Sequence, residues 1–303
     1  MGIDLPYVFV IDIDGTMIGN CSYQTQQYSL LTMLKKMGYR VPSVSTCSRA
    51  YSPDQSLVRP GVASFIHAMK KIYNNVHFFV YTASHKDWAH QEISWIEKQH
   101  NIKFNRPLFT RPDCVVDGAG NYRKSLQKII PRIMRAITVK GSKPFTRREQ
   151  SYILENQLMI IDNNAVFLDR SDRLLLCPDY NFTLFEPLTD LIPADAMTNP
   201  SVQQHILSLV NQSLICPVKQ QSRDRTEVLA NQYVWLAKHC RNIAELNAMY
   251  KTDDFWFYIT KIIMKNNIRT YSPVIIQQLQ KGIWNNMKRK RASQPISSDR
   301  HSI

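Results

Sequence analysis

The sequence places two carboxylates one residue apart at the end of an apolar run. Asp12 and Asp14 follow the segment YVFVI, and Gly15 and Thr16 come directly after them. Two acids in this arrangement can divide labour, because one carboxylate can attack an electrophile while the other moves a proton. Since two carboxylates this close repel each other, a cation such as Mg²⁺ would stabilise both in their ionised forms. The alternative for this stretch is an exposed Asp-Gly turn.

Further polar groups that suit phosphate chemistry follow at three places along the chain. Thr82 ends the run FFVYT, and its hydroxyl could bind a phosphoryl oxygen. Asp162 and Asn163 end MIIDN, and hard oxygen donors of this kind suit Mg²⁺. Lys124 lies in GNYRKSL, where an ammonium could neutralise a phosphoryl group in its transition state. Each residue alone has an ordinary explanation, as a turn residue or as one charge in a basic run.

Apolar periodicity indicates strands that alternate with helices. Continuous apolar runs predict buried strands, and apolar residues three and four apart predict the helices between them. The expected strands cover residues 7–13, 76–84, 107–110, 158–161, 174–177 and 181–184. The expected helices of this part cover residues 25–38, 59–73 and 86–100. This alternation predicts an α/β domain of three layers around a mainly parallel sheet.

The predicted sheet brings the candidate residues together. Ligands of open parallel sheets bind beyond the carboxyl ends of the strands. Asp12 and Asp14 sit at one such end, Thr82 at a second, and Asp162 with Asn163 at a third. We therefore expect three separate motifs to converge on one edge of the sheet.

The order of these motifs resembles that of the haloacid dehalogenase (HAD) superfamily. More closely, the chain is similar to the FCP/SCP-like phosphatases, also called NLI-interacting-factor-like or RNA polymerase II C-terminal-domain phosphatases. The matching stretches are Arg59–Gly61, Tyr81–Ser84, Arg111–Cys114, Gly120–Leu126 and Ile160–Asn163. The resemblance covers about residues 7–192 and implies a HAD-like Rossmannoid domain.

The resemblance implies a role for each matching residue. Asp12 would be the nucleophile that becomes an aspartyl-phosphate. Asp14 would be the general acid for the leaving hydroxyl and then the base for the hydrolytic water. Thr82 and Lys124 would hold the phosphoryl oxygens, and Asp162 would place Lys124 or a metal-bound water.

The resemblance also implies a Mg²⁺ site and a set of substrate contacts. The metal ligands would be Asp12, Asp14 through its carbonyl, and Asn163, with Asp162 beside them. The candidate substrate-binding residues are Gly15, Thr16, Ala83, Ser84 and Arg111.

Three departures from the family pattern concern the substrate. Gly15 stands where the family usually has Asp or Glu. Residues 25–38 have helical spacing where the family commonly has a β-hairpin. An insertion separates Lys124 from Asp162, and residues 123–148 carry nine basic side chains and no acidic one.

The pattern divides the chain into three parts. Residues 1–195 form the expected HAD-like phosphatase domain, with insertions at about 20–57 and 131–155. From about residue 196 onward only helical periodicity remains, so residues 196–287 are expected to form a helical appendage. Residues 288–303 are basic and polar, and we expect them to be disordered.

Charge and motifs together give three hypotheses for the function. The net charge of +14 predicts acidic partners. The first hypothesis is a Mg²⁺-dependent phosphatase for phosphoserine or phosphothreonine in proteins, whose basic insertion would suit an acidic or multiply phosphorylated segment. The second is a nucleic-acid 3′-phosphatase, since a basic surface attracts a polyanion. The third is a non-catalytic scaffold of the same fold that serves assembly.

Composition also bears on the location of the protein. The six cysteines are scattered without zinc spacing, as expected of free thiols in a reducing compartment. No apolar run approaches the roughly 20 residues of a membrane span. We therefore expect a soluble intracellular protein with no membrane partner. Lys288–Arg291 resembles a short nuclear localisation signal, so the nucleus is one expected location and the cytoplasm the other; the same run could touch nucleic acid.

Overall fold

The computed structural model groups the chain into two compact units. It describes residues 5–19, 30–41, 57–139, 141–182, 192–205 and 247–293. Unit 1 comprises Met1–Thr16, Pro60–Pro178 and Asp254–Ile303, and unit 2 comprises Met17–Arg59 and Asp179–Asp253. Unit 1 holds the sheet and the candidate site.

A parallel sheet of four strands forms the centre of unit 1, in the order β2-β1-β5-β6. The strands are β1 (Tyr7–Ile11), β2 (Val76–Val80), β5 (Leu158–Asp162) and β6 (Leu174–Leu176). In the register, Val10 of β1 lies opposite Phe79 of β2 on one side and Ile160 of β5 on the other. Every residue of β1 and β5 is buried, as the continuous apolar runs require. The prediction of a mainly parallel sheet is confirmed.

Helices and short elements complete the described residues. The helices of unit 1 are α3 (Val62–Ile72), α4 (Lys86–His100), α5 (Leu126–Ile137), α6 (Arg147–Tyr152), α11 (Phe255–Lys265) and α12 (Pro273–Ser293). Its short elements are η1 (Arg111–Asp113), the antiparallel pair β3 (Val115–Val116) and β4 (Tyr122–Arg123), the π-helical turn η2 (Ile153–Gln157) and η3 (Ser171–Arg173). In unit 2 the structure describes helical residues 30–36, 200–205 and 247–251 and η4 (Ala194–Thr198).

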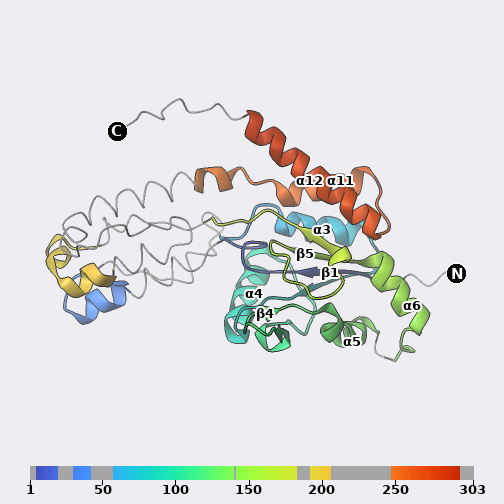
Figure 1. Cartoon of the computed structure of the whole chain (residues 1–303), viewed down its shortest axis with the longest axis horizontal. Coiled ribbons are helices and arrows are strands. Elements are labelled where there is room, and N and C mark those ends of the chain that lie inside the picture. Colours follow the sequence, from blue (N-terminus) through green and yellow to red (C-terminus); the bar gives the residue numbers. More distant parts are fainter. Residues whose placement is uncertain are drawn as a thin grey trace. The chain divides into compact units, whose positions relative to one another are not determined.

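Helices cover both faces of the sheet, which gives the expected three layers. On one face, Phe65 of α3 packs edge-on against Phe9 with the ring centroids 5.4 Å apart. Trp256 of α11 then packs on Phe65 at 4.9 Å. Successive residues of a strand point to opposite faces, so Val8 and Val10 face the other side, where the apolar residues of α5 cover them. Figure 1 shows α3, α11 and α12 on one side of the sheet and α5 on the other.

Most of the predicted elements are present, with one strand reduced to a single bridge. Of the expected strand 107–110, only Phe109 pairs in β fashion, in a parallel bridge with Tyr81. Pro107 has no N–H to give to a ladder, and the N–H of Thr110 donates to the Asp113 carboxylate instead. These two losses explain why the segment runs along the sheet edge without forming a regular strand.

Two other predictions fall partly on residues that the structure does not describe. Residues 30–36 of the expected helix 25–38 are helical, and residues 25–29 lie outside the described part. In the expected strand 181–184, Asn181 and Phe182 have no regular secondary structure, and residues 183–184 lie outside the described part.

The C-terminal helices belong with the sheet rather than with residues 196–253. Helix α12 reaches β6, where the Gln280 side chain accepts from the Leu176 N–H and donates to the Leu176 carbonyl, both at 2.8 Å. The same helix runs on to Ser293, so residues 288–293 are helical and not disordered as expected; residues 294–303 lie outside the described part. None of the described helices is long and apolar enough to cross a membrane.

Candidate active site

The loop after β1 carries the two candidate acids and requires a glycine. Asp12 is only 6% exposed, and its N–H donates to the Ile161 carbonyl of β5 at 3.0 Å. Gly15 has a φ of +68°, and a Cβ added there would lie 2.5 Å from the side-chain nitrogen of Asn163. Both the backbone conformation and the close approach of Asn163 therefore favour glycine. An acidic residue at position 15 would displace Asn163, which accounts for this departure from the family pattern.

Lys124 joins the motif that contains Asp12 to the motif that contains Asp162. Its ammonium donates to Asp12 Oδ1 at 2.5 Å and to Asp162 Oδ2 at 2.7 Å, and all three side chains are buried. Burial lowers the pKa of Lys124, and the two carboxylates raise it by more, so the net pKa lies above the ordinary value. Burial raises the pKa of Asp12, and the Lys124 ammonium opposes that rise. The three groups form a buried ionic bridge, in which Lys124 donates to one oxygen of each carboxylate.

The backbone around Lys124 is fixed from a distant loop. The N–H of Lys124 donates to the Val166 carbonyl, and its carbonyl accepts from the N–H of Leu168. Asp169 accepts from the Ser125 hydroxyl and the Leu126 N–H, both at 2.7 Å, which caps the N-terminus of α5. Asp169 was not among the predicted site residues. A capping acid supplied from more than 40 residues away leaves no local sequence pattern.

Asp14 lies in a different environment from Asp12. The Ser84 hydroxyl donates to Asp14 Oδ2 at 2.7 Å, and the Thr82 hydroxyl lies 3.5 Å from the same oxygen. Thr82 in turn accepts from the Ser84 N–H at 3.1 Å. Burial raises the pKa of Asp14, and the hydrogen bond from Ser84 opposes that rise. One acid therefore faces a cation and the other faces hydroxyls, which suits different tasks.

Thr16 gathers the hard oxygen donors of the site. Its hydroxyl lies 3.4 Å from Asp12 Oδ2 and 3.2 Å from Asn163 Oδ1. It also accepts from the Asn163 N–H at 3.0 Å. A carboxylate oxygen and an amide oxygen thus lie on either side of one buried hydroxyl, and both are ligand types that Mg²⁺ prefers.

The charges of the site fit a divalent cation. Asp12, Asp14 and Asp162 bring three carboxylates against the single ammonium of Lys124, so their ionised forms together carry net negative charge and would repel a phosphoryl group. Both oxygens of Asp162 are engaged, one by Lys124 and the other by the Asn164 N–H at 2.8 Å. Among the described residues no three Asp, Glu, His or Cys side chains are grouped as metal ligands. The side-chain donors that fit are therefore those of Asp12 and Asn163, and the Asp14 carbonyl stays an expectation from the family resemblance.

The sequence matches a known protein family over most of the described α/β domain. A family model described as NLI interacting factor-like phosphatase matches residues 7–193. The chain belongs to this family. The family resemblance expected from the motifs is thereby confirmed, and the structure has the expected α/β fold with a mainly parallel sheet. Membership in this family supports a phosphatase.

Solved structures of RNA polymerase II CTD phosphatases are similar to this chain at low identity. One is a variant of the fission yeast CTD phosphatase Fcp1 bound to beryllium fluoride, with 16% identity and a TM-score of 0.37 over 90% of this chain and 70% of that one. Another, titled as the structure of Fcp1, an essential RNA polymerase II CTD phosphatase, has 15% identity and a TM-score of 0.37 over the same shares. A comparison with curated protein sequences found no match.

Arg111, which the resemblance places at the substrate, lies beside the motif that contains Thr82 and Ser84. Arg111 Nε donates to the Ala83 carbonyl at 2.8 Å, and a second guanidinium nitrogen lies 2.7 Å from His85 Nε2. The guanidinium also lies 4.9 Å from the centre of the Tyr122 ring. Arg111 is therefore fixed next to the segment whose Ser84 hydroxyl donates to Asp14; its contact with a substrate stays a prediction.

Helix α11 contributes a contact to the first motif from outside the segment matched by the family model. The indole N–H of Trp256, which is fully buried, donates to the Thr16 carbonyl at 3.3 Å. The same helix explains Gly61, whose φ is +88° and whose added Cβ would lie 3.0 Å from Trp256 Cβ. Neither contact was predicted, because a helical pattern shows that a face is buried but does not show what it covers.

Proposed function

We propose that this chain is a Mg²⁺-dependent phosphatase that hydrolyses phosphoserine or phosphothreonine in proteins through an aspartyl-phosphate on Asp12. The observation that carries the proposal is the contrast between the two acids of the first motif. Asp12 is paired with Lys124 at 2.5 Å, while Asp14 accepts from Ser84 at 2.7 Å. Ionic pairing favours a carboxylate that attacks, and a buried hydroxyl-bound carboxyl favours one that carries a proton.

The proposed reaction has two steps, formation of the aspartyl-phosphate and its hydrolysis. A carboxylate oxygen of Asp12 attacks phosphorus, the bond from phosphorus to the substrate oxygen breaks, and Asp14 gives its proton to that oxygen. Water then attacks the phosphoryl group, Asp14 takes a proton from it, and the bond from phosphorus to Asp12 breaks to release phosphate. Lys124 and Thr82 stabilise the phosphoryl oxygens, and Asp162 keeps Lys124 in place.

The bound Mg²⁺ would supply charge neutralisation and orient the phosphoryl oxygens. Asp12, Asn163 and the Asp14 carbonyl would hold it. Arg111, fixed beside Ala83, would bind the substrate next to the phosphate. A protein substrate is supported by the family, and the basic residues between 123 and 148 favour an acidic or multiply phosphorylated segment.

A substrate panel with an Asp12→Asn variant tests the proposal. The panel contains a phosphoserine peptide, a phosphothreonine peptide, a 3′-phosphorylated oligonucleotide and p-nitrophenyl phosphate, each with Mg²⁺ or with EDTA. We expect Asp12→Asn to lower kcat by at least about 10³-fold on every substrate, because the nucleophile is gone. Asp172→Asn removes an equal charge from a half-exposed side chain in unit 1 and serves as the control.

Three results would overturn the proposal in different ways. Turnover that survives Asp12→Asn excludes an aspartyl-phosphate on this residue. Faster release from the oligonucleotide than from either peptide would favour the nucleic-acid 3′-phosphatase. No Asp12-dependent turnover of any substrate would favour a scaffold role.

A further inference from the structure

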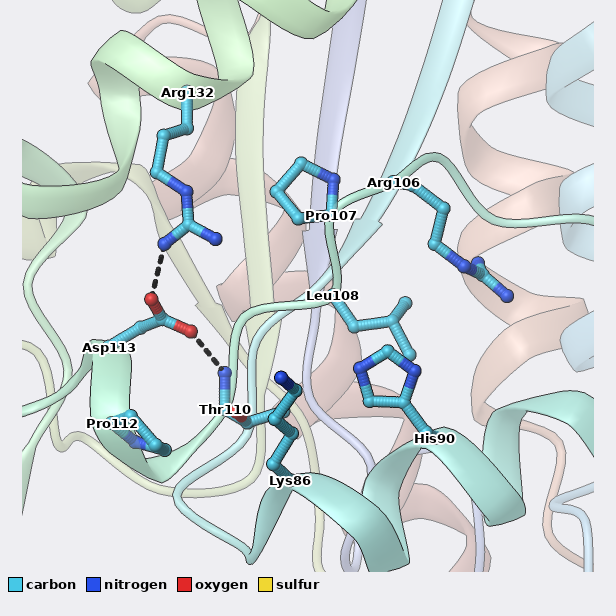
Figure 2. Close-up of a pocket in the computed structure, with 9 residues that line it drawn as sticks. All are labelled: Lys86, His90, Arg106, Pro107, Leu108, Thr110, Pro112, Asp113 and Arg132. Atoms are coloured by element: carbon cyan, nitrogen blue, oxygen red, sulfur yellow. Dashed lines mark hydrogen bonds and ion pairs between the residues drawn. The ribbon is translucent and has the colours of Figure 1, made fainter.

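A pocket of about 370 Å³ lies over the sheet edge next to the candidate active site. Figure 2 shows its walls. Lys86 and His90 project from α4 on one side, Arg132 projects from α5 on the other, and the segment containing Pro107 and Leu108 runs between them. The pocket therefore draws its walls from two helices and the irregular edge segment.

The side chains of this pocket carry more positive than negative charge. Lys86 and His90 are exposed, and neither has a hydrogen-bonding or ionic partner among the described residues. Arg132 pairs with Asp113, the one acid of the lining, whose second oxygen accepts from the Thr110 N–H at 2.9 Å. The only acid of the lining is thus already engaged, and the Lys86 charge and the His90 imidazole are left for a ligand.

The two arginines of the pocket are held in place by contacts with neighbouring residues of the protein. Arg106 forms two hydrogen bonds with Glu97 of α4, at 3.0 and 2.9 Å. The guanidinium of Arg132 lies 4.9 Å from the centre of the Phe109 ring, which fixes it over the edge segment. Both arginines are thus held in place by the protein, and the Lys86 amine and the His90 imidazole lie on α4, opposite Arg132.

An apolar floor lies beneath the charges. Leu108 is 4% exposed, and Pro107 and Pro112 flank it in the lining. A small anion with a short carbon stem would bury the stem on this floor and present its charge to Lys86 and Arg132. A phosphorylated serine or threonine side chain has this form and carries nearly two negative charges at neutral pH.

The pocket and the candidate active site share the same two loops. Lys86 lies two residues beyond Ser84, which donates to Asp14. Pro112 and Asp113 directly follow Arg111, which donates to the Ala83 carbonyl. An extended peptide advances about 3.3 Å per residue, so a substrate bound at Asp14 and Arg111 can pass its next residues toward the pocket.

We propose that this pocket binds a second phosphorylated side chain of the substrate, near the residue that is being dephosphorylated. The inference rests on the proposed function for its substrate class, and it adds a preference for segments that are phosphorylated more than once. Lys86 and His90 supply the charge-assisted hydrogen bonds, and Arg132 supplies long-range attraction while it remains paired with Asp113.

Peptide kinetics with a double variant test this proposal. The substrates are a singly phosphorylated peptide and a set of doubly phosphorylated peptides whose second phosphate lies two to five residues away on either side. One further peptide has Glu at the second position, which separates a phosphate from a carboxylate. We expect the wild type to show roughly tenfold higher kcat/KM for the best doubly phosphorylated peptide, mainly through KM.

The variant Lys86→Ala with His90→Ala should remove most of that preference and leave turnover of p-nitrophenyl phosphate unchanged. Lys103→Ala is the matched control, since Lys103 is an exposed lysine of unit 1 that does not line the pocket. The preference should also weaken as salt is raised, because the two side chains are exposed.

The outcomes separate this proposal from the proposed function. If the wild type hydrolyses the singly phosphorylated peptide but shows no preference for a second phosphate, the pocket proposal is wrong and the function stands. If the preference survives in the double variant, another surface provides it, and the pocket proposal is wrong. If no substrate is turned over, peptide binding measured by fluorescence anisotropy decides: equal affinity of wild type and double variant for the doubly phosphorylated peptide refutes the pocket.

Discussion

Two neighbouring regions of unit 1 hold their basic side chains in opposite ways. In the candidate active site Lys124 is 2% exposed and bridges the carboxylates of Asp12 and Asp162. In the edge pocket Lys86 and His90 are exposed and have no partner among the described residues. The buried cation orders the reacting groups and has its charge satisfied within the protein. The exposed Lys86 charge and His90 imidazole stay available to a ligand, so one region supplies chemistry and the other supplies selectivity.

Helix α4 separates the two regions. Its exposed side carries Lys86 and His90, and its buried side carries Glu92, which is 6% exposed. The two regions should also differ in their response to salt, because dissolved ions screen exposed charges strongly and buried charges weakly. The following predictions test first the buried region, where we expect the largest effects.

Removal of the buried cation should have the largest effect. Lys124→Met keeps the length of the stem and leaves Asp12 and Asp162 without their shared partner. We expect kcat for p-nitrophenyl phosphate to fall by about 10²–10³, as for the loss of one electrostatic group from an active site. Steady-state kinetics with Mg²⁺ measure the fall, and near-UV circular dichroism reports whether the fold is kept.

Lys128→Met is the control for this change. Lys128 lies in α5, four residues after Lys124, and among the described residues its ammonium donates to two backbone carbonyls, of Cys114 at 2.7 Å and Pro112 at 3.3 Å. We expect it to retain activity. A folded Lys124→Met protein with kcat within threefold of the wild type would remove the reason for treating the two regions as different.

The buried acid of α4 should give a pH-dependent effect on stability. Burial and, secondarily, the charge of Asp14 raise the pKa of Glu92 from 4.5 to about 7, and Glu92 Oε2 has no hydrogen-bond partner among the described residues. Because the folded-state pKa is the higher one, the folded protein binds more protons than the unfolded chain between these values. The free energy of unfolding should therefore fall by roughly 3 kcal/mol as the pH rises from 4.5 to above 7.

The variant Glu92→Gln should not show this fall in the free energy of unfolding at high pH. Chemical denaturation at pH 5 and pH 8 should show the variant gaining stability relative to the wild type at the higher pH. Glu155→Gln, on an exposed residue of unit 1, provides the comparison at both pH values. If the stability of Glu92→Gln and of the wild type depends equally on pH, ionisation of the buried Glu92 does not lower the free energy of unfolding.

The sequence predicted the buried region well and the exposed one poorly. Asp12, Thr82 and Asp162 follow apolar runs, and the geometry of a parallel sheet alone places such strand ends at one edge. Helix α4 was predicted with the bounds that the structure gives it, Lys86–His100, because its apolar spacing is regular. The edge pocket was not predicted, since its lining comes from two helices and a loop whose contact depends on tertiary packing.

The sequence also did not predict which distant residues hold α5 and the loop after β1 in place. Asp169 is one loop acid among several, and nothing near it indicates that it caps α5. Trp256 lies in an apolar helix whose pattern predicts burial, but the pattern does not identify the Thr16 carbonyl as its partner. Long-range contacts of this kind depend on which surfaces meet, and a periodicity describes only one of the two surfaces.

The contact of Trp256 with Thr16 gives the smallest expected effect and the sharpest test of these supports. Trp256→Phe keeps an aromatic ring against Phe65 and removes the indole N–H that donates to the Thr16 carbonyl. One lost hydrogen bond is worth about 0.5–1.5 kcal/mol, so we expect a fall of roughly two- to tenfold in kcat with little change in KM. The loop that holds Asp12 and Asp14 would remain folded but less well positioned.

Tyr258→Phe is the matched control because it also removes one hydrogen bond from α11. The Tyr258 hydroxyl donates to the Gly282 carbonyl of α12 at 2.9 Å and does not touch the first motif. If both variants lower kcat equally, α11 acts only through general stability. If Trp256→Phe alone lowers kcat while both variants lose similar thermal stability, α11 positions the catalytic loop, and the buried region extends beyond the segment that the family shares.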